Sequence, residues 1–172
     1  MRWTKRKARV ESMFSDSVKG RVELKSSRYR GSHDEVGRGY ITFDKKELWS
    51  MCTLTFFPIE AERIQVIAER DNVTPYQAQK EALKNLYSEG ILSQEMFYRS
   101  LDEYCNNSIE KSLSSDNLLI RCLSLLDSRV GKRRLRQLIN EQLKLKELEF
   151  LKIRYECESI PFRIEETLPK SI

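Results

Sequence analysis

The chain has 172 residues and a net charge of +5, with 40% apolar and 33% charged residues, so it can form one ordinary domain with a real core. Its longest apolar run, residues 54–59, is far shorter than the roughly 20 residues that span a membrane, which excludes a membrane-spanning helix. The first residues are basic and no apolar segment follows them, so the sequence predicts no secretory signal and a cytoplasmic location.

The N-terminal third predicts one short helix followed by strands. Residues 3–14 place apolar side chains on one side at helical spacing. Residues 20–57 alternate apolar and polar positions and are rich in β-branched and aromatic residues, with the last strand expected over Leu48 to Phe57 and closed by Pro58. This pattern predicts a three-stranded antiparallel β-meander with one face covered.

The region 60–157 has a helical pattern, and we expect it to form a bundle of about five helices. Thr74-Pro75-Tyr76-Gln77 predicts a helix start, because threonine can cap, proline suits the first helical position and glutamine completes a capping box. Gly90 is typical of a helix C-terminus and Ser93 can cap the next helix at once. Residues 83–101 therefore predict a tight αα-hairpin.

The apolar stripe of the next long helix breaks at Gly131, which predicts a kink or a helix end there. The last helix is expected from about Asn140 to Glu156, and residues 160–172 form a loosely held tail. Because strands precede helices, the whole chain 1–172 is predicted to be a single α+β domain: a short N-terminal helix, an antiparallel β-meander and a helical bundle.

The cysteines and the histidine give no metal pattern. Four cysteines are widely separated in sequence, none forms a C-x-x-C pair, and the only histidine is far from all of them. We therefore expect four reduced, mostly buried thiols, with no metal and no cofactor.

The basic charge is concentrated in two segments. Residues 1–9 contribute +5 and residues 121–136 another +5, so the remainder carries −5. Such clustering creates local positive potential that attracts nucleic acid or an acidic protein. A solvated helix face whose cations complement the helix C-terminus is the alternative, and Asp127 is placed to pair with a neighbouring arginine. If the second segment is helical, four of its cations share one face, namely Arg129, Lys132, Arg133 and Arg136. The anion-binding candidates are these four together with Arg30 and Arg121.

A second constellation lies in a polar turn between strands. His33 titrates near neutral pH, Asp34 is adjacent to it and Arg38 follows closely, so these three are the candidates for acid–base catalysis. A plain polar turn with exposed charges explains the same residues. Nucleotide-binding loops and serine-hydrolase motifs are absent from the sequence.

Two resemblances accompany these patterns. Residues 83–101 look like the short helical hairpin known as the SHOCT domain. The chain also resembles an uncharacterised family of small bacterial proteins through three groups of residues: Lys19-Gly20-Arg21-Val22; Tyr29-Arg30, His33-Asp34, Gly37-Arg38, Ile41 and Asp44; and Asn117, Ile120-Arg121, Leu126-Asp127 and Arg129-Val130-Gly131-Lys132-Arg133. This resemblance implies a bacterial cytoplasmic protein with no assigned activity.

Three functions remain open at this point. The favoured hypothesis is a non-enzymatic binding or regulatory protein that engages nucleic acid or an acidic protein through its basic helices, away from membranes. One alternative is a protein–protein or immunity-type module, including a homodimer, that acts through the helical hairpin. The other is a small enzyme that uses His33 and Asp34.

Overall fold

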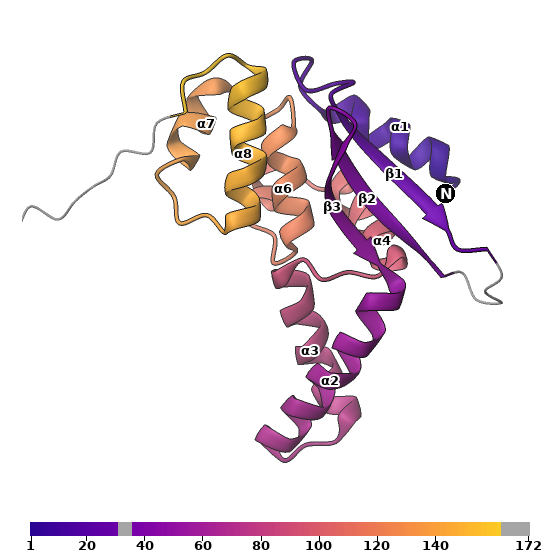
Figure 1. Ribbon diagram of the computed structural model, residues 1–172. Coiled ribbons are helices and arrows are strands. Elements are labelled where there is room, and N and C mark those ends of the chain that lie inside the picture. Colours follow the sequence, from indigo (N-terminus) through magenta and orange to yellow (C-terminus); the bar gives the residue numbers. More distant parts are fainter. Residues whose placement is uncertain (31–35, 163–172) are drawn as a thin grey trace, which may run out of the picture.

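Figure 1 shows the computed structural model of the chain, which describes residues 1–30 and 36–162. Over these residues one helix is followed by three strands and then by seven helices, so the predicted α+β class is confirmed. No helix in the described part of the chain is long and apolar enough to cross a membrane.

The first helix and the sheet form as the local pattern predicts. Helix α1 spans Trp3–Met13, and the strands are β1 (Val22–Arg28), β2 (Gly37–Phe43) and β3 (Lys46–Cys52). The strands pair in the order β1-β2-β3, and both pairs are antiparallel. The predicted meander is therefore confirmed over the three described strands.

One face of the sheet is buried and the other is open. Leu24 lies opposite Ile41, Gly39 lies opposite Met51, and all four are buried. A Cβ atom on Gly39 would lie 2.1 Å from Cδ1 of Phe97, so glycine lets helix α4 (Gln94–Asn106) pack directly on the strand. Helices α1 and α4 cover this face.

The predicted end of the β region is wrong. Strand β3 ends at Cys52, and Thr53 already begins helix α2, which runs Thr53–Asp71 with Pro58 inside it. The β-branched and aromatic residues of this stretch bury Thr53 and Phe56 at helical spacing rather than every second residue. Pro58 is exposed near the helix start, where the missing N–H removes only one bond to a carbonyl of the first turn.

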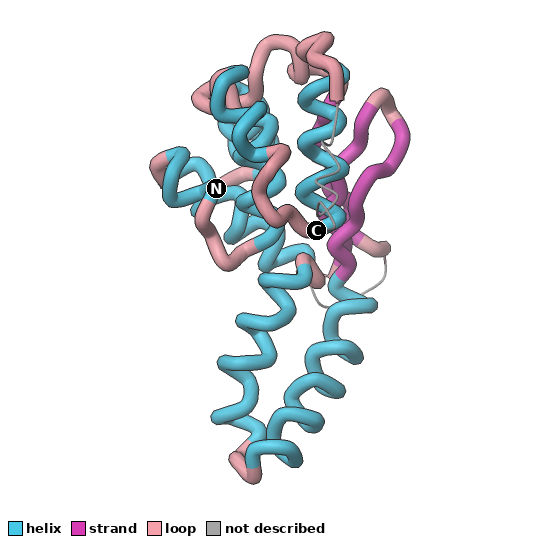
Figure 2. The backbone as a smooth tube through the Cα atoms, turned by 90° about the vertical axis from the view of Figure 1, so that its left-hand side faces the viewer, coloured by secondary structure: helices cyan, strands magenta, loops and turns pink. Residues whose placement is uncertain are grey.

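Helix α2 pairs with helix α3 (Pro75–Glu89), and the two extend away from the rest of the molecule as an arm (Figure 2). The predicted start of α3 is confirmed: the Thr74 hydroxyl accepts from the Gln77 N–H, and the Gln77 side chain accepts from the Thr74 N–H. Gly90 ends α3 with φ 75°, also as predicted.

Beyond Gly90, however, the two helices diverge. Ser93 caps α4 as expected, but α4 packs on the sheet and α3 packs beside α2 (Figure 1). The packed αα-hairpin is therefore α2–α3 rather than residues 83–101, because the apolar faces of α3 and α4 turn toward different partners.

Among the remaining helices, α6 (Leu118–Leu126) lies deepest, and every residue in it except Arg121 is buried. The others are α5 (Ile109–Leu113), α7 (Lys132–Leu138) and α8 (Leu145–Cys157). The predicted helix break at Gly131 is confirmed, since this residue is the N-cap of α7. The last helix begins at Leu145 rather than near Asn140, because the Glu147 carboxylate accepts from the Lys144 N–H and fixes the start there.

Candidate anion-binding surface

Helix α7 carries the densest group of cations. Its Leu135 and Leu138 are buried against the core, which turns the remaining side chains outward. Lys132 is 58% exposed and lies 3.4 Å from a Glu158 carboxylate oxygen, a loose ion pair. The outward cations of this helix are Lys132, Arg133, Arg134 and Arg136.

Two of these cations have no acidic partner within residues 1–30 and 36–162. Arg133 and Arg136 are exposed and form no ion pair or hydrogen bond with any residue in the described part of the chain. Arg134 instead pairs with Glu141 at 3.1 Å, beside a cavity of about 610 Å³ that Glu110 also lines. The free guanidinium groups of α7 are thus those of Arg133 and Arg136.

Arg129 is held by a buried carboxylate. Asp127 is completely buried, and its Oδ2 accepts from the Tyr104 hydroxyl at 2.6 Å and from Nη2 of Arg129 at 2.7 Å. Its Oδ1 accepts from both the backbone N–H and Nε of Arg129, at 2.8 and 3.0 Å. Burial and the nearby Asp127 charge raise the pKa of Tyr104, so its hydroxyl stays protonated and donating. The predicted pairing of Asp127 with an arginine is confirmed.

Because Gly131 breaks the helix, Arg129 lies outside α7. The expected helical face shared by four cations therefore does not include Arg129.

Arg154 of α8 fixes the connection between α6 and α7. This arginine is buried and donates to the carbonyls of Leu126, Asp127 and Val130, at 2.7, 3.1 and 3.3 Å. Burial lowers the pKa of Arg154, although Glu158 pairs with it at 3.0 Å. The position of Arg129 is therefore set by buried polar bonds.

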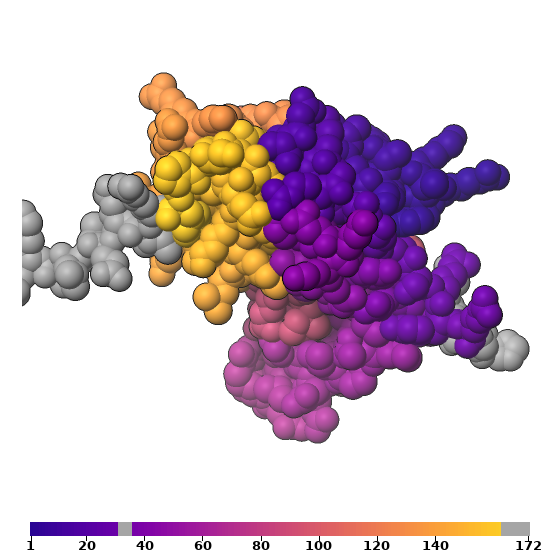
Figure 3. All heavy atoms as spheres, turned by 45° about the horizontal axis from the view of Figure 1, so that its top comes forward, coloured from indigo at the N-terminus to yellow at the C-terminus, as the bar shows by residue number. Residues whose placement is uncertain are grey.

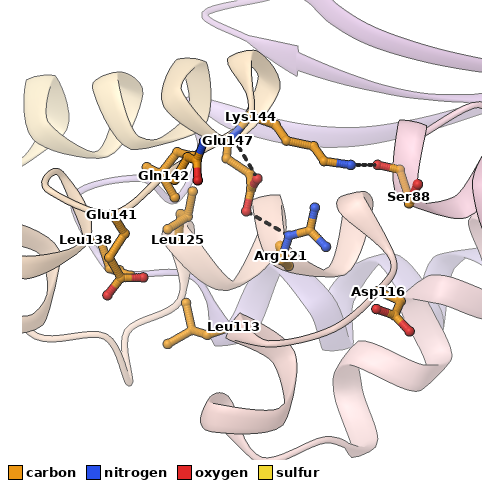
Figure 4. A pocket seen from close by; sticks show the side chains of 11 residues that line it. Ser88, Leu113, Asp116, Arg121, Leu125, Leu138, Glu141, Gln142, Lys144 and Glu147 are labelled. Carbon is orange, nitrogen blue, oxygen red and sulfur yellow. Dashed lines mark hydrogen bonds and ion pairs between the residues drawn. The ribbon is translucent and has the colours of Figure 1, made fainter.

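Arg121 belongs to a different place in the structure. It is the one half-buried residue of α6, and its Nε donates to Oε1 of Glu147 at 2.8 Å. The pair lies in a pocket of about 430 Å³ whose rim carries Asp116 and Glu141 (Figure 4). Lys144 in the same pocket reaches the carbonyl of Ser88. With acids on three sides, this pocket does not favour an anion.

The N-terminal basic segment meets the second one at the end of α4. Arg9 donates to the carbonyl of Cys105 and to Oδ1 of Asn106, at 3.2 and 2.8 Å. Arg129 donates to the carbonyl of the next residue, Asn107, at 3.1 Å. Two cations separated by 120 residues thus bind three consecutive residues.

The end of α1 and the residues after it are also hydrogen-bonded to the connection between α6 and α7. Ser128 donates to the carbonyl of Met13, and Ser15 donates to that of Leu126, both at 2.9 Å. Figure 3 shows the indigo-to-purple part of the chain that follows α1 beside the orange and yellow C-terminal helices. We use the name basic surface for the outward cations of the two segments: Arg9 and Arg129, which meet at the end of α4, and Lys132, Arg133 and Arg136 of the α7 helix.

The rest of the N-terminal segment is partly tied down. Arg6 forms a two-pronged ion pair with Asp102 of α4, at 2.8 and 2.7 Å, and this pair lowers the pKa of Asp102. Arg2, which precedes α1, and Lys5 in its first turn are both exposed. The cations of residues 1–9 therefore both anchor the helix and extend the positive potential along it.

Arg30 and Arg38 belong to the sheet region of the molecule. Arg30 is exposed just after β1, and the end of β1 lies far from α7 in Figure 1. Arg38 lies on the open face of the sheet, pairs with Glu47 at 2.9 Å and stacks on the ring of Tyr40. His33 and Asp34 fall outside the described residues. Among the described candidates, Arg30 and Arg38 are thus separate from the basic surface.

Cys52 is a feature that the sequence did not indicate. It is the N-cap residue of α2 and lies opposite Arg38 in the sheet. Burial opposes ionisation of its thiol, but bonds from the Tyr29 hydroxyl and from the N–H groups of Thr55 and Leu54 lower its pKa overall. All four cysteines are free thiols, yet only Cys122 is fully buried, so the expectation of mostly buried thiols is wrong. Sequence analysis did not single out Cys52 because it placed residues 48–57 in a strand and so missed the helix that begins at Thr53.

Comparison with known proteins identifies a family. A family model described as the SF0329 protein family matches residues 2–157, and the chain therefore belongs to this family. No curated protein and no solved structure matches the chain.

Proposed function

We propose that this member of the SF0329 protein family binds nucleic acid through the phosphate backbone, using the basic surface. The observation that carries the proposal is that Arg133 and Arg136 are exposed and unpaired within the described part of the chain, on the same helix as the exposed Lys132 and a few residues after the partly exposed Arg129. Guanidinium groups match phosphate oxygens in a two-pronged geometry, and several of them close together bind a chain of phosphates.

The chemistry of the surface favours nucleic acid over an acidic protein. Protein–protein interfaces are anchored by buried aromatic or large apolar side chains. Neither α7 nor the segment 127–131 exposes a large apolar side chain; those of the described residues lie mainly on α2, α3 and the ends of other elements. A surface with cations and no apolar anchor suits contacts to phosphate, which are independent of base sequence.

The proposal includes a bacterial cytoplasmic setting, which rests on the sequence resemblance. It is supported by the four unpaired thiols, which persist in reducing compartments. The separate resemblance of residues 83–101 to a SHOCT hairpin does not support the proposal, because α3 and α4 share only the turn at Gly90 and do not pack as a hairpin.

The test measures binding of fluorescein-labelled duplex DNA and single-stranded RNA by anisotropy at several salt concentrations. With three or more phosphates neutralised, the logarithm of the association constant should fall with the logarithm of salt concentration with a slope of about −2.7 or steeper for duplex DNA and about −2.1 or steeper for single-stranded RNA. The variant Arg133→Glu/Arg136→Glu should reduce affinity about tenfold or more and make the slope shallower by about 2.

A matched control reverses two exposed lysines elsewhere, Lys45→Glu/Lys84→Glu, with the same change in net charge. This control should keep most of the affinity. Absence of binding at about 50 mM salt, or an equal loss in the control, overturns the proposal. Binding of a poly-glutamate peptide as tight as that of nucleic acid favours an acidic protein instead.

A further inference from the structure

The arm formed by α2 and α3 has a thin core of its own. Its buried residues, Ile67, Ala78 and Ala82, form a cluster separate from the main core, supported by the partly buried Ile64 and Ala68. Figure 2 shows the two helices extending together beyond the rest of the molecule. Both long sides of the arm therefore face away from the main core over much of their length.

The two sides of the arm differ in chemistry. On one side, Arg63 forms a two-pronged ion pair with Glu89 at 2.7 and 3.0 Å, and Arg70 pairs with Glu81 at 2.9 Å. These ion pairs join α2 to α3 and cover that side with charge. We call it the ion-paired side.

The other side is apolar. Leu54, Phe57 and Ala61 follow one another at spacings of three and four residues, the pattern of a helix–helix seam. Leu54 is 58% exposed and Phe57 55% exposed. On α3, Tyr76 is 86% exposed, and Leu83 lies seven residues later on the same side. We call this the apolar side of the arm.

The apolar side continues into a groove at the root of the arm. The groove has a volume of about 520 Å³, and its apolar walls come from α2, α3 and α4. Its apolar lining includes Phe56, Phe57, Leu83 and Met96, and its charged lining residues are Glu60, Glu95 and Arg99. An apolar surface of this extent, rimmed by charge, is typical of a protein-binding site.

We propose that the apolar side of the arm binds the same side of a second copy of this chain, with the two arms antiparallel about a two-fold axis. This dimer is independent of nucleic-acid binding. The reason to choose a second copy is that the apolar side is self-complementary when it is reversed, which a two-fold interface requires.

Positions along the helices show this complementarity. Leu54 is the second residue of α2, counted from the root, and Tyr76 is the second residue of α3, counted from the tip. In an antiparallel pair these two apolar side chains lie side by side. Glu60 lies about 10 Å along α2 and Lys80 about 8 Å along α3, so the acid of one arm meets the base of the other. Neither residue has an ion-pair partner in the described part of the chain.

The available area lies at the lower end of the range of specific interfaces, which bury about 1,000 Å² or more in total. Helix α2 has 19 residues and is about 28 Å long, and two adjacent helices are about 20 Å wide. The flat area is then on the order of 560 Å² per copy, and the accessible area of an uneven surface is larger. A standard specific interface buries about 800 Å² per partner.

The test measures the mass in solution by light scattering and sedimentation from about 1 to 200 µM, a range set by typical affinities. The wild-type chain of 20.4 kDa should have the mass of two copies at the upper concentrations. The variant Leu54→Gln/Phe57→Gln should be a monomer with unchanged helix content by circular dichroism, because both side chains are largely exposed. Val66→Gln is the control, since Val66 is 53% exposed but lies toward the ion-paired side.

A charge exchange tests the partner and the orientation. Glu60→Lys and Lys80→Glu should each weaken the dimer at least about fivefold, and the double exchange should restore it, because both pairs of the two-fold interface are then re-formed. A wild-type monomer at every concentration overturns the proposal. So does a dimer that persists in Leu54→Gln/Phe57→Gln or one that the double exchange fails to restore.

Discussion

Replacing Asp127 with alanine tests whether the buried polar network, rather than solvent-exposed charge, holds Arg129. Asp127 accepts four hydrogen bonds: one from the Tyr104 hydroxyl and three from Arg129, at 2.6 to 3.0 Å. Tyr104 is completely buried, so its hydroxyl cannot reach water when the carboxylate is removed. Arg129 is partly exposed, and its guanidinium can turn toward solvent.

The burial of Tyr104 and the partial exposure of Arg129 determine how much each substitution should lower the free energy of unfolding. An unpaired buried hydroxyl costs about 1–3 kcal/mol, and loss of a carboxylate from a buried ionic network raises the total to about 3–5 kcal/mol for Asp127→Ala. Tyr104→Phe leaves the Arg129 bonds intact and should cost only about 0.5–1.5 kcal/mol. Arg129→Ala leaves a buried carboxylate with one side-chain donor and should cost about 2–3 kcal/mol, less than the full value because Arg129 is partly hydrated.

Urea denaturation followed by circular dichroism measures these free energies of unfolding. Asp16→Ala is the control for removal of an aspartate, because Asp16 is 96% exposed and should change stability by no more than about 0.5 kcal/mol. Arg133→Ala is the corresponding control for removal of an arginine. The reasoning is refuted if Asp127→Ala costs less than about 1 kcal/mol or if Arg129→Ala destabilises no more than Arg133→Ala.

Three further predictions concern other parts of the molecule. Iodoacetamide should alkylate Cys52 before the other three cysteines, whose pKa values burial raises, and peptide mass spectrometry would expose a different order. Gly39→Ala should cost about 1–3 kcal/mol by pushing Phe97 off the sheet, and an unchanged urea midpoint contradicts this. The Arg6–Asp102 pair stabilises the fold above the unfolded aspartate pKa of about 3.9 and should lose this effect as pH falls through the lower folded value; Asp102→Asn should flatten that part of the stability–pH curve.

Several features of this protein follow from the sequence alone because they depend on residues within one turn of each other. The capping box at Thr74, the C-terminal glycine at Gly90 and the cap at Ser93 form as predicted. The helix break at Gly131 was visible as a rotation of the apolar stripe, and the meander was visible in its alternation and turns. Fold class and the location of basic segments were therefore set locally.

The local sequence pattern predicted the wrong element where the same residues are compatible with both a strand and a helix. The stretch 53–57 has strand-forming side chains, yet it begins a helix because Thr53 and Phe56 find buried positions at helical spacing. Likewise the turn at Gly90 is local, but the directions of α3 and α4 are decided by α2 and by the sheet.

The division of the cations into paired and free ones was decided by the tertiary structure. Arg121 and Glu147 are 26 residues apart, and Tyr104 reaches Asp127 across 23 residues. Sequence could place Arg129 near Asp127, but only the packing of α4 against α6 buries that carboxylate and thereby holds the arginine. Because ion pairs form between side chains that folding brings together, only the placement of the helices shows that Arg133 and Arg136 have no acidic partner among the described residues.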